Sequence, residues 1–213
     1  MLNSIVEVAR PEVIVLKSAG NRTFCAGASF DESIQIENIK SGIEFFSGFA
    51  NVINACRKCT KIIIGRVQGK AVGGGVGIAS AVDYCFATQH ASVKLSELAL
   101  GIGPFVVGPA VERKVGLSSM SALAINADKW FDANWGFKKG LYSEIFQDNE
   151  SMDKAIDELA FKLSKSHSNC GNESIINLTG VSSDGTAQSF ISQGIPGKGQ
   201  TWPVNRMSKY DGS

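Results

Sequence analysis

The stretch IIIGRVQGKAVGGGVGIASAVDYCFAT, residues 62–88, decides the fold class of this chain. It begins within one apolar run, Lys61–Val67, and ends with another, Tyr84–Thr88, and both runs favour buried strands. Between them a glycine-rich turn leads into a helix predicted over Val76–Asp83. A strand, a turn, a helix and a second strand in this order are typical of an α/β layered fold.

The turn itself, GKAVGGGVG at residues 69–77, is the strongest local signal. Glycines allow positive φ angles and close approach of a ligand to the backbone, and a helix that begins there offers unpaired N–H groups. Such a turn can bind phosphate or stabilise an oxyanion, or it can serve only close packing of helix on strand. A Walker phosphate loop is absent, and the dinucleotide fingerprint fails because Ser80 stands where its third glycine belongs.

Working outward from this turn, strands and helices alternate along the chain. Strands are predicted at Glu12–Lys17 and Ser92–Leu95, and a further helix within Asp128–Phe146 ends in a strand-like segment. The remaining helices are predicted at Ile34–Thr60, Val106–Val115, Ser118–Asn126 and Met152–Ser166. We therefore expect one core domain over residues 1–166, followed by an atypical Gly/Ser-rich C-terminal tail over residues 167–213.

Composition excludes several classes of function. The 213 residues carry a net charge of +1, which predicts neither a nucleic-acid partner nor a membrane partner. Met1–Arg10 lacks the basic region followed by an apolar one that marks a signal peptide. The number of cysteines is odd, which suits a cytoplasmic protein. The pair Cys56 and Cys59 lacks further ligands nearby, so no metal site is expected. His90 is expected at the surface, and Trp130 in the core or at a subunit interface.

Two further segments could carry chemistry. The segment FCAGASF, residues 24–30, is a second turn of small residues after an apolar strand, and two such turns can direct two N–H donors at one oxygen. Glu97 lies in the mostly apolar VKLSELAL, where desolvation would raise its pKa toward the range of a general acid/base. Taken alone, the segment FCAGASF is an ordinary loop and Glu97 is a solvent-facing or salt-bridged side chain.

These three segments together, in this order and spacing, resemble the enoyl-CoA hydratase/isomerase (crotonase) superfamily. VIVLKSAGNRTFCAGASF is similar to the first oxyanion segment of that family, residues 62–88 to the second, and ASVKLSELALGIGP to the segment with a catalytic glutamate. The resemblance runs from about Val13 to about Phe146. It implies a crotonase-like (ClpP/crotonase) ββα spiral with its N-terminal strands missing, an acyl-CoA substrate, and a homotrimer or hexamer. No cofactor is implied, because coenzyme A is carried as part of the substrate.

The resemblance also implies roles for individual residues. The backbone N–H groups of Ala28 and Gly74 would polarise the thioester oxygen, and Glu97 would transfer protons at the acyl carbons. The residues implied in substrate binding are Ala26, Gly27, Gly73, Gly75, Gly77, Pro104 and Phe105. Classical hydratases carry a second glutamate at the position of Gly77, so the single acid here slightly favours double-bond isomerisation over hydration.

Both ends of the chain depart from the family pattern, which suggests a truncated or frame-shifted member. Three interpretations are consistent with the sequence. The chain is an enzyme that hydrates or isomerises enoyl-CoA thioesters, as in fatty-acid or branched-chain acyl-CoA degradation. In the second interpretation, the chain is a non-catalytic acyl-CoA binder or an inactive fragment. In the third, it is a nucleotide-binding α/β domain.

Overall fold

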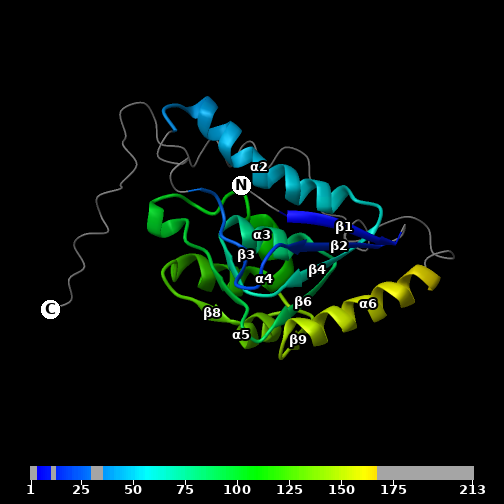
Figure 1. Cartoon of the computed structure of the whole chain (residues 1–213). Helices are drawn as coiled ribbons and strands as arrows, with labels where there is room; N and C mark the ends of the chain where they lie inside the picture. The colour runs from blue at the N-terminus through cyan, green and yellow to red at the C-terminus, as the bar shows by residue number, and fades with distance from the viewer. Residues whose placement is uncertain (1–3, 11–12, 30–35, 167–213) are drawn as a thin grey trace.

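In a computed structural model of the chain, the described residues are 4–10, 13–29 and 36–166 (Figure 1). Their main sheet has five strands in the order β1-β2-β4-β6-β9. β1 is antiparallel to β2, and the other neighbours are parallel. The strands are β1 (Ser4–Arg10), β2 (Val13–Ser18), β4 (Ile62–Val67), β6 (Tyr84–Thr88) and β9 (Glu144–Phe146).

A second, smaller sheet has the order β3-β5-β7-β8. Its strands are β3 (Thr23–Cys25), β5 (Lys70–Val72), β7 (Ser92–Lys94) and β8 (Phe131–Asp132). The first three run parallel, and β8 is antiparallel to β7. The middle residues of the parallel strands are buried while their neighbours are more exposed, so one face of this sheet packs on the core.

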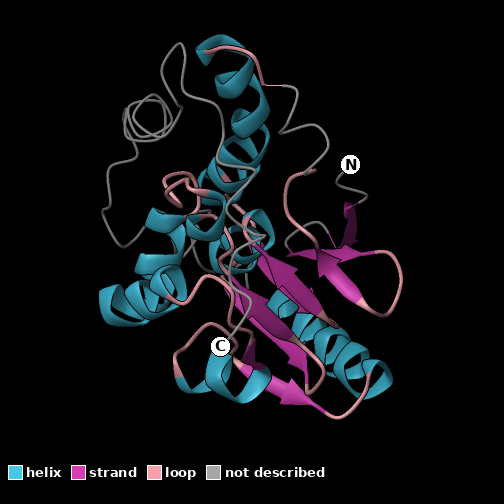
Figure 2. Cartoon of the chain, turned by 90° about the vertical axis from the view of Figure 1, so that its left-hand side faces the viewer, coloured by secondary structure: helices cyan, strands magenta, loops and turns pink. Residues whose placement is uncertain are grey.

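Helices cover the main sheet on both sides (Figure 2). On one side, α6 (Asn149–Ser166) packs Met152, Ile156 and Ala160 against Val15 and Phe86 of the strands. The other side holds the larger core cluster, built around α3 (Gly74–Ala81). The remaining helical elements are α2 (Ile39–Lys58), η1 (Leu98–Leu100), α4 (Gly108–Ile125) and α5 (Ala133–Lys138).

Two helix boundaries differ from the predictions for local reasons. α2 begins at Ile39 because Asn38 caps it, with its side chain accepting from the Ser41 backbone N–H at 3.0 Å. α4 joins the two predicted helices into one segment, with a non-helical residue at Gly116. There φ is +79°, a conformation that glycine adopts readily.

The α/β layering predicted from the sequence is confirmed, with several additions. The first strand predicted was Glu12–Lys17. The main sheet contains one more strand before it in the chain, β1, which pairs with β2. The short strands β3, β5 and β8 were not predicted, because β3 and β5 lie in segments interpreted as turns and β8 in one interpreted as helical. The predicted tail, residues 167–213, lies outside the described residues. Within the described ranges, no helix is long and apolar enough to cross a membrane.

Candidate active site

The two glycine turns predicted from the sequence lie against each other. β3 and β5 are parallel neighbours, and the turns come directly after their C-terminal ends. Gly27 and Gly73 have φ angles of +85° and +50°, which suit glycine and strain other residues. A Cβ atom on Gly27 would lie 2.9 Å from the carbonyl oxygen of Val72 and 3.8 Å from the backbone nitrogen of Gly74. The segment Ala26–Ala28 therefore runs next to the beginning of α3.

A second close approach holds the two turns together. A Cβ atom on Gly75 would lie 2.5 Å from the carbonyl oxygen of Cys25, so only glycine fits this position without a backbone shift. On the other side, the Gly73 N–H donates to the Lys94 carbonyl at 2.9 Å and ties the turn to β7. The first hydrogen bond of α3 runs from the Val76 N–H to the Gly73 carbonyl. The N–H groups of Gly74 and Gly75 precede this bond, and such groups have no acceptor within a helix.

Glu97 brings a carboxyl group to the same place. It lies between β7 and η1, where its carbonyl accepts from the Leu100 and Ile102 N–H groups at 3.0 and 3.1 Å. A Cβ atom on Gly73 would lie 3.0 Å from Oε1 of Glu97, so the carboxyl group rests on the glycine turn. The structure thus brings Glu97, Gly73 and the first residues of α3 together.

The carboxyl group of Glu97 is largely removed from solvent. Its Oε2 atom is buried and has no hydrogen-bond partner among the described residues. Desolvation by burial raises the pKa of Glu97 from 4.5 to about 7, against a smaller lowering by its own backbone N–H. A carboxyl group with such a pKa can take up a proton and give it back near neutral pH, as a general acid/base must.

Phenylalanine rings surround this part of the chain. The ring of Phe49, from α2, covers Gly74 so closely that a Cβ atom there would lie 2.2 Å from its Cε1 atom. After η1, the ring of Phe105 folds back over Gly103, and a Cβ atom on Gly103 would lie 2.4 Å from its Cζ atom. Phe105 was predicted from the sequence and Phe49 was not, since no local pattern indicates where a residue of α2 contacts α3.

A family model described as enoyl-CoA hydratase/isomerase matches residues 2–173. The chain belongs to the enoyl-CoA hydratase/isomerase family. The family predicted from the three segments is thereby confirmed, as is its fold.

The names of individual relatives describe several activities on coenzyme A thioesters. The chain is 30% identical to a short-chain-enoyl-CoA hydratase of Clostridium acetobutylicum, over 70% of this chain and 57% of that protein. It is 29% identical to an ethylmalonyl-CoA decarboxylase of Danio rerio, over 68% of this chain and 47% of that protein. The chain thus spans about half the length of these curated relatives.

Solved structures show the same fold. A crystal structure of an enoyl-CoA hydratase from Shewanella pealeana matches with a TM-score of 0.65 and 27% identity, over 71% of this chain and 56% of that one. An enoyl-CoA hydratase from Bacillus anthracis matches with a TM-score of 0.68 and 20% identity, over 76% of each chain.

In this chain the neighbours of Gly77 leave no space for a side chain there. A Cβ atom there would lie 2.7 Å from Cγ1 of Val107 and 3.0 Å from Cδ1 of Ile53. Position 77 is therefore packed between α4 and α2, and apolar side chains rather than Glu97 lie next to it. Among the described residues, no group of His, Cys, Asp and Glu side chains could hold a metal ion.

Proposed function

We propose that this hydratase/isomerase family member turns over an enoyl-CoA thioester, with Glu97 as its acid/base. The backbone N–H groups of Ala28 and Gly74 would hold the thioester oxygen. One observation carries the proposal. The desolvated carboxyl group of Glu97 rests on Gly73, directly before the helix whose first N–H groups are free of intrahelical bonds.

The reaction that fits one carboxyl group is the movement of a double bond. With a 3-enoyl-CoA, the carboxylate of Glu97 takes a proton from C2, and the electron pair of that C–H bond moves into a dienolate on the thioester oxygen. The protonated carboxyl group then returns its proton to C4, and the double bond lies between C2 and C3. Two N–H donors aimed at the developing oxyanion each lower the barrier by about 3–4 kcal/mol, as in other oxyanion holes.

Hydration demands more than this site offers among the described residues. Adding water across a double bond requires one group to activate the water and a proton to reach C2. The position of the second glutamate is Gly77, where Val107 and Ile53 fill the available space. This packing supports isomerisation over a two-carboxylate hydration. A dienoyl-CoA isomerase of Mus musculus is among the relatives, 29% identical over 63% of this chain.

The test uses purified protein with a 3-enoyl-CoA and, separately, a 2-enoyl-CoA, monitored by the absorbance of the conjugated thioester. We expect conjugation to appear with the 3-enoyl substrate. The rate of this appearance should be at least about a hundredfold lower in Glu97→Gln. Glu112→Gln is the matched control, since Glu112 is exposed on α4. Loss of conjugation from the 2-enoyl substrate would instead establish hydration. Equal rates in both variants would refute the role of Glu97.

A second candidate is a non-catalytic acyl-CoA binder. The apolar packing around Gly77 favours it, because the position of one family acid is closed to any side chain. Saturable binding of a 2-enoyl-CoA without any change in conjugation of either substrate would establish this alternative. The nucleotide-binding interpretation predicts instead that NAD or ATP binds and that coenzyme A does not.

A further inference from the structure

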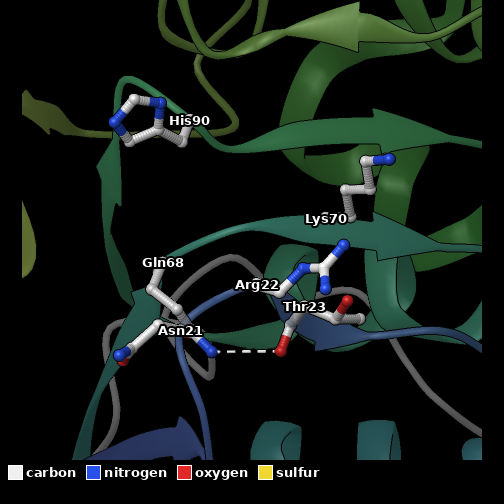
Figure 3. A pocket seen from close by; sticks show the side chains of 6 residues that line it. All are labelled: Asn21, Arg22, Thr23, Gln68, Lys70 and His90. Carbon is white, nitrogen blue, oxygen red and sulfur yellow. Dashed lines mark hydrogen bonds between the residues drawn. The ribbon is translucent and has the colours of Figure 1, made fainter.

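A cavity of about 580 Å³ lies at the opposite ends of β3 and β5 from the glycine turns (Figure 3). The parallel strands begin at Thr23 and Lys70, which form a register pair, and end toward Gly27 and Gly73. The turn between β6 and β7 supplies a third wall. The cavity is lined by Asn21, Arg22, Thr23, Gln68, Lys70 and His90. It is thus separated from Glu97 by the length of the small sheet.

The lining is cationic. Arg22 and Lys70 are basic residues, and none of the lining residues is an aspartate or a glutamate. Figure 3 shows the Arg22 and Lys70 side chains on one side of the cavity and His90 on the other. Within the described ranges, no carboxylate forms an ion pair with Arg22 or Lys70. No carboxylate among the described residues therefore neutralises their charge.

The backbone beneath the two cations is fixed. The Lys70 N–H donates to the Arg22 carbonyl at 3.2 Å, and a Cβ atom on Gly69 would lie 2.2 Å from the same oxygen. The Gln68 side chain is buried and its Nε2 donates to Ser18 Oγ at 2.8 Å and to the Thr23 carbonyl at 3.0 Å. Residues on both strands are therefore held in place before any ligand arrives, which lowers the entropic cost of binding.

An aromatic ring positions two lysine side chains of the small sheet. The Nζ atoms of Lys70 and Lys94 lie 4.9 and 5.2 Å from the ring centroid of Trp130, within the range of cation–π attraction. Trp130, which was predicted to lie in the core or at a subunit interface, is 40% exposed and thus lies partly at the surface of this chain. The ring holds two ammonium groups on the same small sheet as Arg22, where like charges would otherwise repel each other.

We propose that this cavity binds the phosphate group of a small phosphate ester or diphosphate. Arg22 presents the planar fork of donors that matches two phosphate oxygens, and Lys70 supplies a compact second charge. Gln68, which also lines the cavity, has a buried Oε1 atom without a hydrogen-bond partner among the described residues. The phosphate belongs either to the coenzyme A part of a substrate or to a separate phosphorylated molecule.

Calorimetric titration of the full chain with inorganic pyrophosphate at low salt tests the site. We expect saturable binding of one pyrophosphate, weakened at least about tenfold by Arg22→Gln or Lys70→Gln, since each removes a charge-assisted hydrogen bond. Lys94→Gln is the matched control, because Lys94 shares the contact with Trp130 but does not line the cavity. We expect it to change the affinity by less than about twofold, because Lys94 does not line the cavity.

Two results would overturn the proposal. One is the absence of saturable binding to the folded native chain. The other is an equal loss of affinity in Lys94→Gln and Lys70→Gln, which would show diffuse attraction by surface charge. A second arm compares coenzyme A with dephospho-coenzyme A on native protein and Arg22→Gln. If Arg22→Gln weakens both compounds, the ligand is the diphosphate of the substrate, and if it weakens coenzyme A but not dephospho-coenzyme A, the ligand is the 3′-phosphate. Unchanged binding of both identifies a separate phosphorylated molecule.

Discussion

Replacing Glu97 with glutamine is expected to stabilise the protein above pH 7 while it abolishes turnover. The substitution keeps the shape of the side chain and removes its charge. In the native protein one carboxyl oxygen is buried without a hydrogen-bond partner among the described residues, and desolvation raises the pKa of Glu97 to about 7. A group that resists ionisation in the folded state makes folding less favourable wherever the unfolded chain ionises freely.

The sign and size of the effect are set by the two pKa values. Below pH 4.5 the carboxyl group is protonated in both states and glutamine changes little. As the pH rises from 4.5 to about 7, the unfolded state ionises first, and the native protein loses up to about 1.4 kcal/mol of stability per pH unit. Above pH 7 the loss levels off at about 3 kcal/mol, which the glutamine variant avoids.

Urea unfolding of the native protein and of Glu97→Gln at pH 4, 6 and 8 measures this difference directly. We expect the variant to be about equal to the native protein at the lowest pH and more stable by up to about 3 kcal/mol at the highest. Glu112→Gln, on the exposed face of α4, is expected to remain within about 0.5 kcal/mol throughout. A difference between native protein and Glu97→Gln that does not change with pH would mean that the carboxyl group is solvated, and the reasoning would be refuted.

Three other predictions concern Glu97, the contact of Gly74 with Phe49 and the ion pair of Arg66 with Asp153. The rate of 3-enoyl-CoA isomerisation should fall about tenfold per pH unit below pH 7, because Glu97 must be ionised to accept a proton, and a flat profile of kcat/KM would exclude it as the base. Gly74→Ala should destabilise the protein by about 1–3 kcal/mol in urea unfolding, because the new methyl group meets the Phe49 ring, and Phe49→Leu in the same chain should recover part of the loss. Asp153→Asn should lower the free energy of unfolding by about 1–3 kcal/mol, since it weakens the two hydrogen bonds from the buried Arg66 guanidinium, and an unchanged midpoint would contradict this.

The larger elements could be predicted because each carries its own signal. β4 is a run of buried residues whose apolar character is visible in the sequence, and α6 shows helical periodicity. β1 carries β-branched residues as well, but its place beside β2 depends on pairing that a sequence does not display. α3 begins two residues earlier than predicted, at Gly74, because packing between α2 and α4 overrides the poor helix propensity of glycine.

The site was predictable where a residue type has a local reason. Gly27 and Gly73 stand at positive φ angles, and an acid among apolar residues marks Glu97 as desolvated. The contacts of Phe49 and Val107 could not be predicted, because they depend on how α2 and α4 pack on α3. The roles of Ala28, Pro104 and the remaining implied site residues stay predictions until the enzyme assay is done.

The pairing of β3 with β5 links the candidate active site to the cationic cavity. Thr23 pairs with Lys70 and Cys25 pairs with Ala71, so β3 advances two residues while β5 advances one. This irregularity behaves as a β-bulge, which bends one strand and redirects the residues after it. At one end it places Gly27 against Val72, and at the other the same strands set Arg22 beside Lys70. A slip of one residue would turn these side chains to the opposite face of the sheet and separate the glycine turns, so both sites depend on a single register.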